Sequence, residues 1–342
     1  LTLAGAVSAS SSSSSSSGHK QFVRRQSAQA SQYPPQLQTP PPSSLKQEWV
    51  DAYNKAKAAG KIPDVPLSTE NPDGSNTYPG TYNKDWCSWT TAKCNGPNDI
   101  YQAPDNEWAI SFDDGPTGAS SKLYTFLEQN NQSATHFMIG SQVVDYMDVV
   151  KEAANKGQEL ALHTWSHSLL TTKDDLGVVG ELGWNLQIIY DATGYIATKM
   201  RPPQGDIDAR VRAIATEVFN VTCVMWDTES NDWCMTKGFK TACPGENPGK
   251  DRASVEAAIN KALVGPKSPG VIVLEHELRK ETVQIFEDYY PKLKGQGWKP
   301  KAISDLGAGM PWYTNAQNGA EAPTKADSIL PGAIQAAKTS NG

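Results

Sequence analysis

Two hydrophobic periods alternate along the chain from about residue 107 onward. Short apolar runs, which are typical of buried strands, are separated by longer segments whose apolar residues recur every three or four positions, as in amphipathic helices. The predicted strands are Trp108–Phe112, Ala134–Ile139, Glu159–His163, Val221–Trp226 and Val271–Glu275. The predicted helices are Ser120–Gln129, Val143–Asn155, Leu176–Thr193, Asp208–Val218, Ser254–Val264 and Thr282–Lys294. Buried strands separated by helices indicate an α/β fold with a parallel sheet or barrel.

The pattern changes at both ends of this region, which suggests four segments. Residues 1–45 hold a Ser run and a Pro cluster, and are predicted to be a signal remnant and a disordered spacer. Residues 46–99 begin with a helical pattern and continue rich in Pro, Gly, Asn, Trp and Tyr, which predicts an irregular extension packed on the main domain. Residues 100–312 form that domain, and residues 313–342 are predicted to be a low-complexity, disordered tail.

Composition excludes some function classes and favours export. The net charge is -6, and no stripe of Lys and Arg appears, which argues against a nucleic-acid partner. No apolar run reaches the roughly 18 residues of a transmembrane helix. Val7–Ala9 resembles a signal cleavage pattern, with a plain tail as the alternative. Ser340–Gly342 is compatible with a mature end left after a lipid-anchor signal (a GPI anchor) was removed, or with a boundary of other origin. Sequons at Asn131 and Asn220 are compatible with glycosylation and secretion.

The cysteine spacing also fits a secreted protein. Five cysteines occur, and none forms a C-x-x-C pair, which disfavours a zinc ribbon or a thioredoxin-like site. The short intervals Cys87 to Cys94 and Cys234 to Cys243 suit disulfides. Cys223 lies in an apolar run and is predicted to be a buried thiol.

Two adjacent carboxylates, Asp113 and Asp114, follow the first predicted strand of the main domain. Neighbouring side chains on a strand point to opposite sides, so the two are expected to take two different roles. Two like charges this close cost free energy unless a cation offsets them. A solvated Asp-Asp-Gly turn is the alternative, and by itself the more common one.

Further polar residues follow the other strands. His163 and His167 end the third strand, at a spacing that places both imidazoles on one side of a helical turn, within reach of one ion. With a strand-end Asp they make a three-ligand set that leaves a position for water, as in catalytic zinc sites.

Three later motifs supply polar groups of other kinds. Arg201 precedes a Pro-rich loop, can hold a carboxylate, and is followed near Gly205 by backbone N–H groups suited to an oxyanion. Asp232 and His276 supply a carboxylate and a candidate general acid.

Trp86 and Trp89 in the extension are interpreted as packing anchors, with sugar-facing platforms as the alternative.

Five ordered motifs resemble the polysaccharide deacetylase family, also known as the NodB-homology group or carbohydrate esterase family four. They are Phe112–Pro116, His163–His167, Arg201–Gly205, Asp232–Trp233 and Leu274–His276, and the resemblance covers about residues 100 to 305. The spacer and the Trp-rich extension are most similar to those of basidiomycete fungal chitin deacetylases.

The resemblance implies a distorted (β/α) barrel of the NodB type and a role for each motif residue. It implies Asp113 as catalytic base, Arg201 as its orienting partner, His276 as general acid and Asp232 as the residue that tunes His276. The implied metal ligands are Asp114, His163 and His167, usually to Zn²⁺ and in some members to Co²⁺. Leu274 and Trp233 are implied to border the acetyl methyl group, with Gln204 near the substrate.

Two positions depart from the family pattern. Gln204 stands where Tyr is common, but the oxyanion role there belongs to the backbone N–H. Glu229 stands where Asp is usual, which changes the surroundings of the site.

The implied reaction is metal-dependent hydrolysis of N-acetyl groups of N-acetylglucosamine residues in chitin, giving chitosan and acetate at the fungal cell wall or outer cell surface. One alternative is an esterase of the same fold that acts on acetylxylan or peptidoglycan. Another is a noncatalytic, polysaccharide-binding wall mannoprotein, which is disfavoured because the full set of catalytic residues is present.

Overall fold

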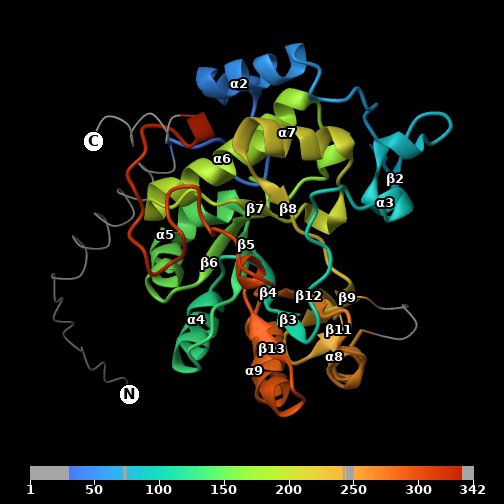
Figure 1. Cartoon of the computed structure of the whole chain (residues 1–342), viewed down its shortest axis with the longest axis vertical. Helices are drawn as coiled ribbons and strands as arrows, with labels where there is room; N and C mark the ends of the chain where they lie inside the picture. Colours follow the sequence, from blue (N-terminus) through green and yellow to red (C-terminus); the bar gives the residue numbers. More distant parts are fainter. Residues whose placement is uncertain (1–30, 72–74, 242, 244–249, 333–342) are drawn as a thin grey trace, which may run out of the picture. The chain divides into compact units, whose positions relative to one another are not determined.

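Parallel strands alternate with helices in a computed structural model that describes residues 31–71, 75–241, 243 and 250–332 (Figure 1). The chain divides into two units, Leu1–Tyr33 and Pro34–Gly342, and the sheets and helices belong to the second. The main sheet contains nine strands in the described residues. They are β3 (Glu107–Ala109), β4 (Ser111–Gly115), β5 (Thr135–Met138), β6 (Glu159–Leu162), β7 (Lys199–Met200), β8 (Thr222–Cys223), β9 (Thr228–Glu229), β12 (Val271–His276) and β13 (Lys299–Lys301).

The sheet closes on itself. The register runs in parallel from β12 through β4, β5, β6 and β7 to β8. The chain after β8 continues into β9, which pairs with β12, so the two ends of the series meet. The segment Cys223–Met225, where the two ends meet, is the barrel seam. Ile100 stabilises it, because its N–H donates to Cys223 O at 2.9 Å and its carbonyl accepts from Met225 N–H at 2.8 Å. The distorted (β/α) barrel expected from the sequence is confirmed.

The core of the barrel is filled by side chains from its strands and from the loops beside them. Small and branched residues dominate, and they form one buried cluster. Its members are Ala103, Ala109, Phe137, Ala161, Val224, Ile272, Ile303 and Leu306. Because this filling occupies the centre, the space for a ligand lies at the strand ends, as in other β/α barrels.

Helices pack outside the strands, and all six that were predicted are present. They are α4 (Ser120–Gln129), α5 (Gly140–Asn155), α6 (Asp175–Thr193), α7 (Ala209–Phe219), α8 (Arg252–Val264) and α9 (Lys280–Gly295). Local capping sets several of their ends. Asp174 accepts the N–H of Gly177 at 2.7 Å at the start of α6, and Gly194 ends this helix at φ 78°. Asp208 accepts from Val211 at the start of α7.

Three strands of the main sheet, β7, β9 and β13, were not predicted from the sequence pattern. β7 contains two residues, and β13 is the polar sequence Lys-Pro-Lys, so neither shows an apolar run. Both are held by pairing with neighbours, which periodicity does not report. Of the predicted strand Val221–Trp226, only Thr222–Cys223 forms a strand, β8. β9 begins at Thr228, beyond the predicted bounds, and is held by pairing with β12.

The N-terminal extension packs on α6 and α7 through α2 (Gln47–Ala58) (Figure 1). Trp49 of α2 lies edge-on to Trp184 and Phe219, with ring centroids 5.3 and 6.2 Å apart. Gly183 leaves room for this indole, because a Cβ there would lie 2.7 Å from Trp49. The remaining short elements of the extension are η1 (Pro42–Ser44), β1 (Thr69–Glu70), β2 (Asn76–Thr77), η2 (Lys84–Trp86) and α3 (Trp89–Ala92).

The short elements of the main domain lie between the barrel strands and helices. They are η3 (Leu170–Thr172), η4 (Pro203–Gly205), η5 (Asp232–Cys234), β10 (Met235–Thr236), β11 (Lys240–Thr241) and η6 (Ile303–Asp305). Three of the strand-end motifs continue into such turns, so their side chains sit on short, tightly bent segments.

The predicted disorder extends too far at both ends. Residues 1–30 and 333–342 lie outside the described residues, but the spacer packs from Pro34 onward. Trp165 Nε1 donates to Pro35 O at 3.0 Å, and Gln36 Nε2 donates to Ser141 O at 2.9 Å. At the other end Tyr313 is buried and stacks on Tyr195 with centroids 4.2 Å apart. These segments are ordered by single aromatic rings and side-chain hydrogen bonds, which leave no periodic pattern to detect.

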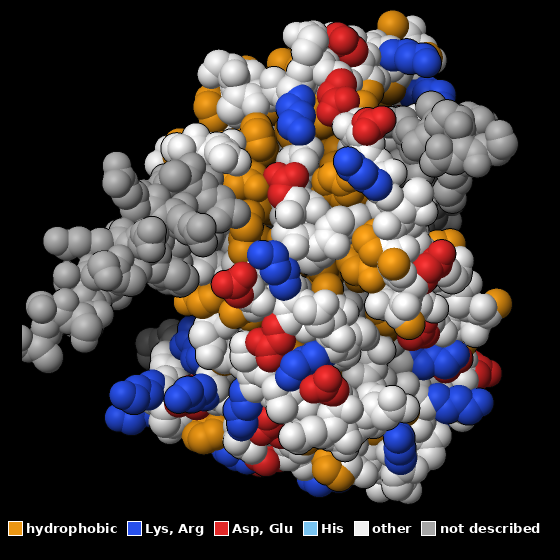
Figure 2. Space-filling model, turned by 90° about the vertical axis from the view of Figure 1, so that its left-hand side faces the viewer, with side chains coloured by type: hydrophobic (Ala, Val, Ile, Leu, Met, Phe, Trp, Pro, Cys, Tyr) orange, Lys and Arg blue, Asp and Glu red, His pale blue; other side chains and the backbone are white. Residues whose placement is uncertain are grey.

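The cysteine predictions are confirmed. Disulfides join Cys87 to Cys94 and Cys234 to Cys243, and Cys223 is a buried free thiol. None of the helices in the described ranges is long and apolar enough to cross a membrane. On the face drawn in Figure 2, Lys and Arg side chains lie next to Asp and Glu side chains.

Candidate active site

A cleft of about 1010 Å³ opens at the carboxyl ends of β4, β6 and β12. Eight of the predicted site residues line it: Asp113, Asp114, His163, His167, Gln204, Trp233, Leu274 and His276. Arg201 and Asp232 are buried, each bonded to one of these residues. The two sequon residues, Asn131 and Asn220, are exposed and do not line the cleft.

A bulge in β4 brings both aspartates to the same cleft. The register with β5 shifts between Asp113 and Gly115, and Asp114 takes a left-handed φ of 66°. The expectation that the two side chains point to opposite sides is therefore wrong, because a bulge interrupts the alternation and re-aims one side chain. Gly115 is required here, since a Cβ would lie 1.7 Å from Glu277 Oε1.

Asp114, His163 and His167 converge on one point. Asp114 Oδ1 lies 3.3 Å from His163 Nε2 and 3.2 Å from His167 Nε2. One ligand atom from each residue lies within 4.8 Å of the others. Asp114 Oδ1 is buried and has no hydrogen-bond partner in the described part of the chain. Opposed nitrogen and oxygen acceptors around a shared point fit a cation, so these residues suit a metal ion.

Contacts behind the triad hold His163 in the orientation that a ligand needs. His163 Nδ1 lies 2.7 Å from Arg201 O, and donation to this carbonyl leaves Nε2 as the free acceptor. The backbone N–H of His163 also donates to Asn185 Oδ1 at 2.9 Å. Burial lowers the pKa of His163, but the neighbouring Asp113 and Asp114 outweigh it and raise this pKa overall.

The segment that carries the two histidines is not the helical turn assumed from their spacing. Thr164 and His167 have left-handed φ values of 64° and 59°. Their rings approach to 4.9 Å because this tight turn folds back, with His167 N–H donating to Thr164 Oγ1 at 3.1 Å. Glu181 of α6 clamps the turn by accepting from both the N–H and the hydroxyl of Ser166.

Sequence reasoning missed Glu181 and Asn185, although a signal existed. Both are fully buried in α6, four residues apart in a helix that is otherwise largely apolar. A buried polar group is costly without a partner, so such a pair in an apolar helix indicates a bonded network.

Asp113 is held by a buried cation. Arg201 Nη1 donates to Asp113 Oδ1 at 2.7 Å, and both side chains are almost fully buried. The guanidinium also lies over the Phe137 ring at 4.3 Å. Asp113 Oδ2 is 3.9 Å from His163 Nε2, which places this carboxylate beside the triad. A fixed carboxylate next to a metal position can accept a proton from a bound water.

His276 and Asp232 form a second pair on β12 and the turn that follows β9. His276 Nδ1 donates to Asp232 Oδ1 at 2.6 Å, and the His276 N–H donates to Asp232 Oδ2 at 2.8 Å. Burial alone lowers the pKa of His276, but Asp232, and then Asp114 and Asp113, raise it to about 10. A protonated imidazole with Nε2 toward the cleft can deliver a proton.

The loop after Arg201 presents one free backbone donor. The Gly205 N–H donates to Pro202 O at 3.0 Å, so this N–H is not free to bind an oxyanion. Gln204 has a left-handed φ of 56°, and its N–H has no hydrogen-bond partner among the described residues.

Glu229, the second departure from the family pattern, lines the cleft and accepts from Asn231 N–H at 2.9 Å.

The extension and the first residues of the main domain supply a further wall that the motifs did not indicate. Trp89, Lys93, Asn95, Tyr101 and Gln102 all line the cleft. Trp86 instead packs against Tyr78 and Tyr82, as a packing anchor does. No apolar period or motif marks the wall residues: Trp89 and Lys93 lie in the loop closed by the Cys87–Cys94 disulfide, and Asn95, Tyr101 and Gln102 lie in the irregular segment after it.

Comparison with known proteins agrees with this geometry. The polysaccharide deacetylase family model matches residues 101–220. Chitin deacetylase 3 of Cryptococcus neoformans var. neoformans serotype D (strain JEC21) is 41% identical over 297 residues, which cover 84% of this chain and 68% of that protein. The chain belongs to the polysaccharide deacetylase family.

A chitin deacetylase of Amylomyces rouxii is 34% identical to this chain over 195 residues, which cover 54% of this chain and 46% of the Amylomyces protein. Among solved structures, the chitin deacetylase of Colletotrichum lindemuthianum has a TM-score of 0.54 at 18% identity. The match covers 63% of this chain and 94% of that one, and shows a shared fold.

Proposed function

We propose that this polysaccharide deacetylase hydrolyses the N-acetyl groups of N-acetylglucosamine residues in chitin, giving chitosan and acetate. One observation carries the proposal: the Asp114–His163–His167 triad, the Asp113–Arg201 pair and the His276–Asp232 pair meet in one cleft. The 41% identity to a protein named chitin deacetylase supports chitin as the substrate.

Each group has a place in amide hydrolysis. Asp114, His163 and His167 would hold a divalent ion, with Zn²⁺ favoured by the nitrogen and oxygen donors and Co²⁺ as the alternative. Such an ion, when bound, polarises water and the acetyl carbonyl. Asp113 takes a proton from the attacking water, and Arg201 holds that carboxylate in place.

The remaining residues act on the other side of the amide. His276 donates a proton to the leaving nitrogen, which is otherwise a poor leaving group. The Gln204 N–H is the candidate donor to the developing oxyanion. Leu274 and Trp233 border the acetyl methyl group.

Two disulfides favour an oxidising compartment, so we place the protein outside the cell, at the cell wall. Exposed sequon residues Asn131 and Asn220 are proposed glycosylation sites there.

Acetate release and metal content together test the proposal. Asp114→Ala and His163→Ala are each expected to lower acetate release from chitin oligomers by more than about 100-fold and to lose bound metal in elemental analysis. Asp148→Ala is the matched control, because its side chain is 88% exposed and does not line the cleft. Full activity in either ligand variant would sink the ligand assignment.

The substrate is decided by comparing acetylated polymers. Release from chitin oligomers should exceed release from acetylated xylan and from peptidoglycan, with mass spectrometry of the products identifying the amide that is cut. Preference for acetylated xylan or peptidoglycan would support the related esterase instead. Binding without any acetate release would support a noncatalytic wall protein.

A further inference from the structure

Two exposed aromatic rings stand out on the surface. Five large hydrophobic side chains are exposed among the described residues: Leu37, Leu67, Tyr101, Trp233 and Val264. The aromatic members, Tyr101 and Trp233, both line the cleft, with 44% and 41% of their surface exposed. Aromatic rings with one open face suit a ligand that has an apolar face and polar edges, as a pyranose ring has.

Tyr101 is fixed between two anchored residues. Ile100 is hydrogen-bonded on both sides to the strand segment Cys223–Met225. Ala103 is buried in the barrel core, and its carbonyl accepts from Gly270 N–H at 3.0 Å. The Tyr101 side chain therefore projects from a backbone that is held by hydrogen bonds on both sides. Little backbone conformational entropy is lost when a ligand contacts its ring.

Lys93 lies on the same wall, and its ammonium group contacts an aromatic ring. Its Nζ sits 3.3 Å from the centroid of the Trp89 ring, and it makes no hydrogen bond or ion pair with the described residues. Trp89 in turn packs on Gly205, where a Cβ would lie 2.4 Å from the indole, and its ring lies 4.6 Å from Trp226. Trp89 is thus a support for Lys93 and the site loop.

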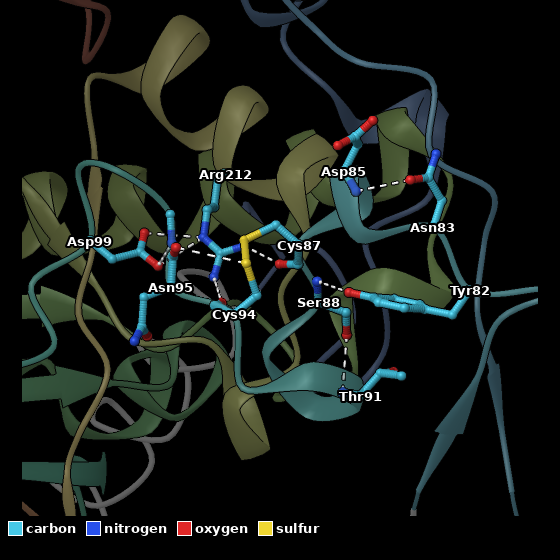
Figure 3. Close-up of a disulfide and its surroundings, with 11 residues drawn as sticks. Tyr82, Asn83, Asp85, Cys87, Ser88, Thr91, Cys94, Asn95, Asp99 and Arg212 are labelled. Atoms are coloured by element: carbon cyan, nitrogen blue, oxygen red, sulfur yellow. Dashed lines mark hydrogen bonds and ion pairs between the residues drawn. A yellow bond between two sulfur atoms is a disulfide. The ribbon is translucent and has the colours of Figure 1, made fainter.

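The loop that carries Lys93 is locked to α7 (Figure 3). The Cys87–Cys94 disulfide closes it, and Arg212 donates to the carbonyls of both cysteines at 2.6 and 2.9 Å. Arg212 Nε also bonds both oxygens of Asp99. The wall is consequently a rigid part of the cleft.

We propose that Tyr101 and Lys93 form an outer sugar-binding subsite, which holds a pyranose unit next to the one whose acetamide meets the Asp113 centre. Tyr101 stacks on the sugar ring, and Lys93 donates to its hydroxyl or acetamido oxygens. The cleft of about 1010 Å³ is at the upper end of ligand sites, which span roughly 300–1,000 Å³, and so has room for more than one sugar. The inference rests on the proposed function for the class of ligand.

Binding of N-acetylglucosamine oligomers of two and five units, by calorimetry in an Asp113→Ala background that prevents turnover, tests the subsite. Tyr101→Ala and Lys93→Met are each expected to raise the Kd of the pentamer by about five- to tenfold, the size of one substantial contact. The Kd of the dimer should change less than the Kd of the pentamer. Tyr101→Phe keeps the ring and should restore pentamer affinity.

Lys84→Met is the control, because Lys84 lies in the same extension, is exposed and does not line the cleft. Unchanged pentamer affinity in Tyr101→Ala, or an equal loss for dimer and pentamer, overturns the subsite. If the unsubstituted protein binds the pentamer more tightly than the dimer but releases no acetate, the subsite stands and the proposed hydrolysis is rejected. The failure of the subsite and the failure of the proposed function are therefore distinguishable.

Discussion

At the residue scale, the adjacent Asp113 and Asp114 differ through their partners. Arg201 donates to Asp113, whereas two imidazoles face Asp114. Asp114 lies buried, which raises its pKa, but the imidazoles of His163 and His167, whose Nε2 atoms lie 3.3 and 3.2 Å from its Oδ1, outweigh burial and hold this pKa well below its ordinary value. An ionised Asp114 is what a metal ligand requires.

The His276–Asp232 pair makes a pH prediction. A general acid must be protonated, so activity is lost as pH rises through the pKa of His276, which is about 10. Asp232→Asn removes the carboxylate that does most to raise this pKa, and the alkaline fall in kcat/KM should move toward neutral pH. Activity should also fall by about 10²-fold or more, the usual size of a general-acid contribution.

The pH–rate profile of kcat/KM measures that shift. A matched profile of Asp227→Asn, whose carboxylate bonds Thr228 and the backbone of Ile272, should keep the position of the alkaline limb. An unshifted limb in Asp232→Asn would remove Asp232 from the role of tuning His276.

At the scale of elements, the extension and the barrel are joined by a buried polar contact. Arg212 of α7 bonds Asp99 and the carbonyls of both cysteines of the first disulfide, and its side chain is 10% exposed. Gly96 permits this approach, because a Cβ there would lie 2.7 Å from Arg212 Cδ. One cation thereby positions a cleft wall that the strand ends do not supply.

Loss of this contact should destabilise the protein measurably. Arg212→Met leaves the buried Asp99 without its cation and should lower the free energy of unfolding by about 3 kcal/mol. Arg252→Met removes a half-exposed pair with Asp288 and should cost less than about 1 kcal/mol. Denaturant unfolding of the two variants gives the comparison, and equal losses would contradict a structural role for Arg212.

At the scale of the molecule, the closed barrel and the extension seal Cys223 from solvent. Burial raises the pKa of its thiol well above the ordinary value, and the nearby Asp99 adds to this effect. Because a thiolate is the reactive form, Cys223 should be inert while the fold is intact. The thiol lies beside the seam formed with Ile100, so its exposure reports opening of the barrel.

A thiol-specific reagent at pH 8 should therefore label no cysteine in the folded chain. In denaturant without reductant it should label one thiol per chain, and with reductant all five cysteines. The time course of labelling against denaturant concentration measures the opening. Rapid labelling without denaturant would show that the seam opens locally.

The sequence by itself determined the six outer helices, the apolar strands, the cysteine pairs and the motif residues at the strand ends. These features depend on local periodicity, short loops and the parallel sheet, which places successive strand ends on one edge. Only the tertiary structure decided the bulge at Asp114, the left-handed turn that joins His163 to His167, and the cleft wall at Tyr101. Each of these is held by residues far away in sequence, such as Glu181, Arg212 and the barrel seam, and therefore leaves no local pattern.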